Sequence, residues 1–495
     1  MPRSQRLGWL ALLVALTATG AVAMPGRDVA EVEAGVEALK LALEAPGAEN
    51  TSTLELFFHS GLSDWVAGPV PAAPVPEADL RAAPKGVPQI EEMDLRLPLA
   101  RISQSFGGKE LGAVRGAQRP GPMTSLVVRR GVARLADIRA HIDLSEDQAL
   151  RRPLVIWPGA ALHLEMGEVL TLSRPDGAFL LNFGHLRIDG ATVRSAGAEN
   201  ARIPRFRPFV TTSAEGVLEV TGGRFEGLGF GQTHKFGGLV LLKNALMPSR
   251  LPSFVRESAF HDTGSVFVHG VAGVEVSGNR FHAARDVPVI VDAADHARVL
   301  GNLFDSDAPG NAIRVLNGAK AAVVSGNVVL GGEKTGIMVR GAREGVQVSH
   351  NLVWGRRGGG VTVVGSDCAA VQSNLILGNR QKGIEVRSSA ETRVRGNLIS
   401  GNRSAGIWVS GQEDQALTRL EHNVLHRNGA GISTATGAHL MLVGNDISQQ
   451  MPRLLGGDLS RQAMLLARDL SGAVPISLSA NGPVDLPSHV PECAR

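Results

Sequence analysis

The sequence has no tyrosine, and aromatic residues make up only 4% of it. The absence of tyrosine excludes every mechanism that uses a tyrosine as acid, base or nucleophile. There are two cysteines, Cys368 and Cys493, which are too few for a zinc cage or a disulfide framework. Beyond the N-terminal segment no run reaches the roughly 18 consecutive apolar residues of a membrane-spanning helix.

A strong excess of charge of either sign is also missing. The 495 residues carry 50 Lys and Arg against 47 Asp and Glu, a formal charge of +3. No basic excess argues for a nucleic-acid partner. Hydrophobic residues make up 43% of the chain, which is enough for a large core and unlike a disordered protein.

Residues 1–23 have the pattern of a secretory signal peptide. Arg3 and Arg6 precede an apolar run that ends in Ala21-Val22-Ala23. We expect cleavage before Met24 and no membrane contact by the mature chain. The oxidising compartment permits a disulfide between the two cysteines, but the sequence does not bring them together, so two free thiols remain an alternative.

The central part of the chain repeats with a period of about 23 residues. Asparagines recur in one series, and Gly-Ile or Gly-Val pairs run in step with them from Gly336 to Gly431. Internal repeats of this length indicate a solenoid. The asparagines suit turns, and when stacked in register their amides can bond coil to coil. The asparagine series comprises Asn279, Asn302, Asn327, Asn351, Asn374, Asn397, Asn423 and Asn445.

Each repeat holds two or three short strand patterns and no helical stretch of 10–12 residues. We therefore predict an all-β fold, a right-handed parallel β-helix over residues 126–445. Residues 24–125 form an N-terminal region with a helix over 28–45 and a Pro/Ala-rich linker over 67–88, and residues 446–495 form a C-terminal cap or tail. The helix is expected to dock on one end of the solenoid, since solenoid ends expose apolar edges.

Strand alternation predicts two outward columns on one face of the solenoid. We interpret the charged and aromatic members as a groove for an acidic polysaccharide, because guanidinium groups bind carboxylates and tryptophan offers a flat face to a sugar ring. A solvated sheet face with ordinary charge is the alternative. The first column is Phe267, Ile290, Arg314, Met338, Thr362, Glu385 and Trp408, and the second is His269, Asp292, Leu316, Arg340, Val364, Arg387 and Ser410.

Three stretches resemble the periplasmic mannuronan C5-epimerases of alginate synthesis: Ala178–Asn182, Phe206–Phe209 and Leu377–Arg387. The resemblance covers somewhat more than half of the chain. It implies a right-handed parallel β-helix in the periplasm that removes the C5 proton of a mannuronate residue and returns a proton to the other face. Such chemistry needs a base near C5 and a positive group that neutralises the sugar carboxylate.

The family carries an Asp-Pro-His-Asp motif on one coil, where this chain has Ile290-Val291-Asp292-Ala293. The family's arginine on the next coil is replaced by Asn317. Under the epimerase hypothesis, His269 or His296 is the base and Asp292 its partner. The substrate-binding candidates are Arg314, Arg340, Glu385, Arg387 and Trp408.

No metal and no other cofactor is expected. Asp305-Ser306-Asp307 offers too few oxygens for calcium and is typical of a turn, and the glycines after Arg357 lack the lysine of a phosphate loop. The first functional hypothesis is thus a mannuronan C5-epimerase-like enzyme. The second is a non-catalytic relative that binds or guides the polymer with other exopolysaccharide secretion proteins. A structural β-helix without a glycan is the third.

Overall fold

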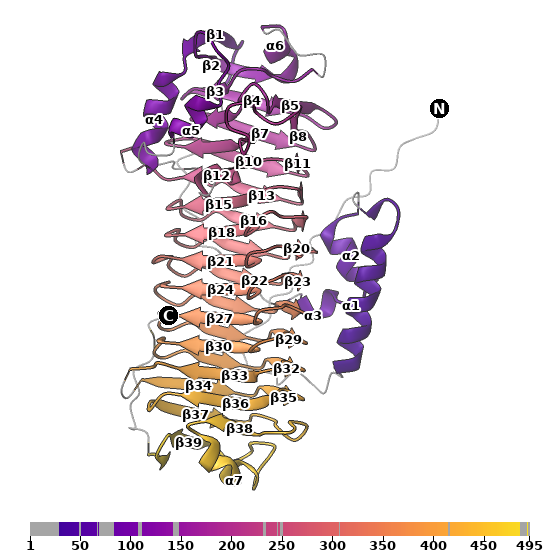
Figure 1. Cartoon of the computed structure of the whole chain (residues 1–495), viewed down its shortest axis with the longest axis vertical. Coiled ribbons are helices and arrows are strands. Elements are labelled where there is room, and N and C mark those ends of the chain that lie inside the picture. The colour runs from indigo at the N-terminus through magenta and orange to yellow at the C-terminus, as the bar shows by residue number, and fades with distance from the viewer. Residues whose placement is uncertain are drawn as a thin grey trace.

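The computed structural model describes residues 29–48, 51–66, 68, 84–106, 111–141, 148–230, 234–244, 246–247, 251–305, 307–413, 416–485 and 493. The signal peptide expected over residues 1–23 and most of the linker expected over 67–88 lie outside this part of the chain. The described residues form a right-handed parallel β-solenoid of about 13 turns, as the repeats predict. Figure 1 shows the coils stacked along one long axis.

Three parallel sheets, here called A, B and C, run along the solenoid, and most coils contribute one strand to each in that order. The strands of sheet A are β3 (Leu154–Ile156), β6 (Leu180–Asn182), β9 (Val210–Ser213), β12 (Gly238–Leu242), β15 (Ser265–His269), β18 (Val289–Asp292), β21 (Ile313–Leu316), β24 (Ile337–Arg340), β27 (Val361–Val364), β30 (Ile384–Arg387), β33 (Ala405–Ser410), β36 (Ala430–Ala435) and β38 (Leu455–Gly457).

Sheets B and C complete each coil. Sheet B contains β4 (Ala160–Leu164), β7 (His185–Asp189), β10 (Val217–Thr221), β13 (Phe254–Arg256), β16 (Glu275–Ser277), β19 (Arg298–Leu300), β22 (Val323–Ser325), β25 (Gln347–Ser349), β28 (Ala370–Gln372), β31 (Arg393–Arg395), β34 (Leu417–Glu421) and β37 (His439–Val443). Sheet C contains β5 (Val169–Ser173), β8 (Thr192–Ala196), β11 (Arg224–Glu226), β14 (Ala259–His261), β17 (Arg280–His282), β20 (Leu303–Phe304), β23 (Val328–Leu330), β26 (Leu352–Trp354), β29 (Leu375–Leu377), β32 (Leu398–Ser400) and β35 (Val424–His426).

The inward valines, isoleucines and leucines of all three sheets form one continuous core. The asparagine series lies buried at the turn between sheets B and C. Each side-chain amide donates to the carbonyl oxygen of the next asparagine, for example Asn351 Nδ2 to Asn374 Oδ1 at 3.0 Å. The ladder runs unbroken from Asn279 to Asn445, which confirms its predicted structural role.

The glycine series is required by close packing between coils. A Cβ atom on Gly383 would lie 2.6 Å from the carbonyl oxygen of Gly406 and 2.6 Å from Cγ2 of Ile399. The backbone atoms of the neighbouring coil cannot move away from such a contact without breaking the hydrogen bonds between the strands. A second amide ladder, which was not predicted from the sequence, passes beside these glycines through Asn379, Asn402, Asn428 and Gln450.

Strands and short helices close the two ends of the solenoid. At the N-terminal end β1 (Gln89–Asp94) pairs antiparallel with β2 (Thr124–Arg134), and α6 (Leu135–Arg139) follows. At the C-terminal end β39 (Ile476–Ser479) pairs antiparallel with β37, next to η3 (Ser460–Gln462), α7 (Ala463–Leu466) and β40 (Gly482–Pro483). Both ends are visible in Figure 1.

The expected docking of the N-terminal helix on a solenoid end is wrong. Helices α1 (Val29–Glu44), α2 (Thr53–His59) and α3 (Ser63–Val66) pack beside the middle coils, against the outer face of sheet C. The reason is that this face is apolar: leucines at 352, 375 and 398 point outward and meet Val36, Leu39 and Trp65 of the helices. Burying them removes apolar area from water.

Cys368 and Cys493 form a disulfide that joins the solenoid to the C-terminal segment, with 5.6 Å between their Cα atoms. Cys368 lies in the turn before β28. In the described part of the chain no helix is both long enough and apolar enough to cross a membrane.

Candidate functional site

The outer face of sheet A has the register that the sequence predicts. Each residue of the two columns pairs with the next residue of its column across the neighbouring coil. We call the two columns the sheet A strip. Adjacent strands lie about 4.8 Å apart, so residues two coils apart in one column are about 10 Å apart.

The strip is covered on its N-terminal side. Helices α4 (Arg96–Phe106) and α5 (Leu111–Gly116) pack over the apolar outer face of the first sheet A strands. Phe267 and Ile290 continue this apolar cluster and are only 6% and 0% exposed. They therefore do not line an open groove, and the accessible strip begins with the column of His269 and Asp292.

His269 and Asp292 form the most defined polar contact of the strip. The Nδ1 atom of His269 lies 2.8 Å from Oδ2 of Asp292. The Nδ2 atom of Asn317 donates to Oδ1 of the same carboxylate at 2.6 Å. The His269 side chain is 40% exposed and that of Asp292 is 15% exposed. The carboxylate therefore orients an accessible imidazole, as a general base requires.

The pKa of Asp292 lies below its ordinary value. Burial raises it, but the hydrogen bonds from His269 and Asn317 and the nearby histidines lower it more. Asp292 is therefore ionised at neutral pH. An ionised carboxylate at Nδ1 of His269 favours the tautomer with its proton on Nδ1, which leaves Nε2 free to accept a proton.

His234 stands beside this pair and was not among the predicted site residues. It belongs to η2 (His234–Phe236), and its ring lies 5.9 Å from that of Phe267, which in turn lies 5.9 Å from the ring of His269. Burial lowers the pKa of His234, and the positive charge of Arg314 lowers it further. Only its residue type could have marked it, because the loop that carries it has no repeat pattern.

Arg314 lies one coil beyond Ile290 in the first column. Its Nε atom donates to Oδ1 of Asn311 at 2.7 Å, which fixes the guanidinium group. Arg340 and Arg387 follow in the second column, with Val364 between them. Both are exposed, and neither forms an ion pair within the described part of the chain. Their spacing is two coils, about 10 Å.

Glu385 and Trp408 belong to a second polar group. Lys382 joins them: its Nζ atom lies 2.7 Å from Oε1 of Glu385 and 5.0 Å from the centre of the Trp408 ring. Lys382 was not predicted as a site residue, although its position three residues before Glu385 is the spacing of a local ion pair. The ammonium group of Lys382 thus balances the charge of the Glu385 carboxylate, and the Trp408 side chain is half-buried.

His296 lies apart from the other base candidate. It is exposed in the turn after β18, with φ of 54°. Among the described residues no hydrogen bond or ion pair joins its side chain to His269 or Asp292. Of the two histidines proposed as a base, only His269 contacts Asp292.

Among the described residues no group of three or more His, Cys, Asp or Glu side chains lies close enough together to hold a metal ion. Asp305, which the sequence places in a turn, accepts from Arg280 at 2.8 Å and His282 at 2.9 Å. Asp307 accepts the backbone N–H of Gly332.

Residues 272–452 match the family model described as periplasmic copper-binding protein (NosD). The matched segment lies within the part of the solenoid that carries the asparagine series. No curated protein sequence matches the chain.

Solved structures share the fold. The periplasmic alginate epimerase AlgG is similar with a TM-score of 0.65 at 17% identity, over 79% of this chain and 98% of that one. A mutant of AlgG gives a TM-score of 0.66 at 18% identity, over 79% and 99% of the two chains. The A-module of mannuronan C-5 epimerase AlgE6 from Azotobacter vinelandii gives 0.39 at 15% identity, over 62% and 85%. The two AlgG structures thus confirm the β-helix fold that the resemblance implies.

Proposed function

We propose that this protein acts on an acidic polysaccharide of the uronate type by proton transfer at C5. The hydrogen bond between His269 and Asp292 carries the proposal, because it supplies an oriented base on an accessible face. The fold shared with AlgG, a periplasmic alginate epimerase, supports the choice of substrate.

In the proposed reaction Nε2 of His269 removes the proton from C5 of a uronate residue. The C5–H bond breaks, and its electron pair moves into the carboxylate to give an enediolate. Solvent water then delivers a proton to the opposite face, which inverts C5, and the imidazolium of His269 releases its proton to the resulting hydroxide. Asp292 stabilises the imidazolium that forms, and its ionised state at neutral pH suits that role.

The arginines would bind the negative charges of the polymer. Arg314 is assigned to the carboxylate of the reacting sugar, since it lies one coil from Asp292 and neutralising the carboxylate makes the C5 proton more acidic. Arg340 and Arg387 would bind carboxylates of sugars further along the polysaccharide, and Trp408 would pack against a sugar ring. Arg340 and Arg387 form no ion pair with any other described residue, which supports a ligand that supplies anions to them.

The test is proton NMR of polymannuronate incubated in deuterium oxide with the mature protein. Guluronate signals or deuterium at C5 are expected with the wild-type chain and not with His269→Gln. His261→Gln is the matched control, because His261 lies on β14 of sheet C, away from the strip. Absence of exchange at high protein concentration would overturn the catalytic proposal.

A non-catalytic polysaccharide-binding protein is the second candidate. Two observations favour it. Asn317, and not an arginine, contacts the carboxylate of Asp292. The coil of Asp292 also lacks the motif of the family that the sequence resembles. Retention on an alginate gel without any C5 exchange would select this candidate. A secreted, periplasmic location is part of both proposals, and the periplasmic descriptions of AlgG and of the matched family model support it.

A further inference from the structure

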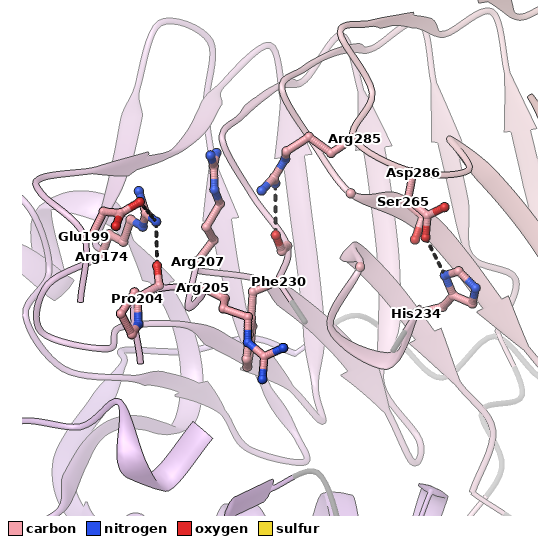
Figure 2. Close-up of a pocket in the computed structure, with 13 residues that line it drawn as sticks. Arg174, Glu199, Pro204, Arg205, Arg207, Phe230, His234, Ser265, Arg285 and Asp286 are labelled. Carbon is pink, nitrogen blue, oxygen red and sulfur yellow. Dashed lines mark hydrogen bonds and ion pairs between the residues drawn. The ribbon is translucent and has the colours of Figure 1, made fainter. Parts of the chain in front are cut away.

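A concave site lies at the edge of sheet A, and its lining includes His234, which stands beside the His269–Asp292 pair. Turns and loops that lead from sheet C into sheet A in successive coils enclose a pocket of about 530 Å³, within the range of small-molecule sites. Figure 2 shows the residues around it. Four arginines line the pocket: Arg174, Arg205, Arg207 and Arg285.

The arginines outnumber the carboxylates that face them. Asp262 is shared, with Oδ2 at 2.5 Å from Nη1 of Arg207 and Oδ1 at 3.1 Å from Nε of Arg285. Glu199 pairs with Arg174 at 3.0 Å. The third carboxylate, that of Asp286, faces Nδ1 of His234 at 3.4 Å.

Arg205 is exposed and has no ion pair within the described residues. One positive charge is therefore left over even when every carboxylate is counted. An anion entering the pocket would gain charge-assisted hydrogen bonds without displacing an existing partner from Arg205.

Backbone contacts hold two of the guanidinium groups in place. Arg174 donates to the carbonyl oxygens of Phe206 at 2.9 Å and Pro204 at 2.8 Å, and its side chain is only 15% exposed. Arg285 donates to the carbonyl oxygens of Leu228 and Gly229. Burial, together with the positive charges of Arg207 and Arg174, lowers the pKa of Arg285 to about 10.

The floor of the pocket is fixed by close backbone packing. A Cβ atom on Gly229, whose φ is 90°, would lie 2.1 Å from the carbonyl oxygen of Gly237. The ring of Phe230 stacks on that of Phe236 with 5.2 Å between centres. An apolar floor with charged walls suits a sugar ring that carries an acidic group.

We propose that the pocket lined by Arg174, Arg205, Arg207 and Arg285 is an anion-binding site that adjoins the strip and takes the carboxylates at the end of a uronate chain. The proposal rests on the proposed function, since it assumes an acidic polysaccharide as ligand. A chain end, and not the middle of a polymer, is assigned because α4 and α5 cover the strip on this side and leave no onward path along sheet A.

The proposal is tested by calorimetric titration with short oligouronates, with long polymannuronate and with inorganic phosphate. Arg205→Gln/Arg207→Gln removes two pocket charges, and Arg340→Gln/Arg387→Gln removes two strip charges. Arg461→Gln/Arg468→Gln in the C-terminal cap is the charge-matched control. Thermal unfolding confirms that each variant is folded.

The pocket variant is expected to bind oligouronates at least about tenfold more weakly than the charge-matched control, and more weakly than the strip variant binds them. Equal oligouronate binding by the pocket variant and the control would overturn the proposal, and it leaves the proposed function intact if the strip variant still loses the polymer. If no uronate of any length binds, the proposed function fails together with the uronate ligand. A further outcome is that the wild type binds phosphate but no uronate, and that only the pocket variant loses phosphate binding. The ligand would then be a free oxyanion, and the chain-end assignment would be overturned.

Discussion

The Nδ1 atom of His269 lies 2.8 Å from Oδ2 of Asp292, one coil further along the same column of sheet A. The two residues lie on different strands, β15 and β18, and they meet because their coils stack in register. A parallel solenoid can thus build an oriented base from residues 23 positions apart in the sequence.

The first prediction concerns this contact. Asp292→Asn should slow C5 proton exchange by about two orders of magnitude or more, because an amide cannot stabilise the imidazolium. Retention on immobilised polymannuronate should change less than about twofold, since the arginines that bind carboxylates are untouched. Exchange is followed by NMR in deuterium oxide, with His261→Gln as control. Equal loss of retention and exchange would show that Asp292 binds substrate or supports the fold.

The second prediction concerns acid stability. The folded-state pKa of Asp292 is lowered from the ordinary value of about 3.9, so its ionised form stabilises the folded protein above about pH 4. That contribution is lost as the pH falls through the lowered pKa. The urea midpoint of the wild type should therefore exceed that of Asp292→Asn at pH 7 and 5, and the difference should shrink below pH 4. A difference that stays constant from pH 7 to pH 3 would contradict the assigned hydrogen bonds.

The third prediction concerns the asparagine ladder. Asn351→Ala removes the two bonds that this side chain donates and the two that it accepts from Asn327, which leaves the buried backbone N–H of Asn327 without an acceptor. Burying unsatisfied groups costs about 1–3 kcal/mol each, so a loss of about 3 kcal/mol or more is expected in urea unfolding. Asn481→Ala, at an exposed turn, is the control. Similar midpoints for both variants would show that the ladder contributes little.

The fourth prediction concerns the disulfide. It joins residues 125 positions apart, and closing a long loop restricts the unfolded chain. Cys493→Ser should lower the free energy of unfolding by about 2–4 kcal/mol and make the protein insensitive to dithiothreitol. Thermal scans of both proteins with and without the reductant measure this. A wild type that does not respond to reduction would argue against the bond.

The fifth prediction concerns the N-terminal helices. Val36 is fully buried in the cluster that joins α1 to sheet C. Val36→Asp should release the helices, expose the outward leucines of sheet C and increase the binding of a hydrophobic dye. Glu33→Gln, at an exposed position of the same helix, should have no effect. Unchanged dye binding and protease resistance in Val36→Asp would contradict the docking.

The sequence predicts the solenoid well because the residues that define each coil recur at a regular interval. The asparagines at a period of about 23 residues define the coil, and two-residue alternation then places Arg340 and Arg387 in one column. Register in a stacked fold follows from these repeats, so His269 and Asp292 can be paired without a structure. The helix over 29–44 is equally predictable from its apolar stripe.

Contacts made by segments outside the repeat could not be predicted. The loop before β12 carries His234 to the strip and has no periodic counterpart in the other coils. The docking of α1 depends on outward leucines in sheet C, which strand alternation alone does not separate from inward ones. Burial of Ile290 has the same origin, because its cover comes from non-repeating segments.

The central claim is that the outer face of sheet A binds an acidic polysaccharide, and the most direct test compares two charge-matched double variants. Retention of wild-type protein, Arg340→Gln/Arg387→Gln and Arg461→Gln/Arg468→Gln is measured on immobilised polymannuronate at several salt concentrations. We predict that the strip variant is retained at least about tenfold more weakly than the other two, and that wild-type retention falls as salt rises. Retention of the strip variant equal to that of the control, or no retention of the wild type, would contradict the claim.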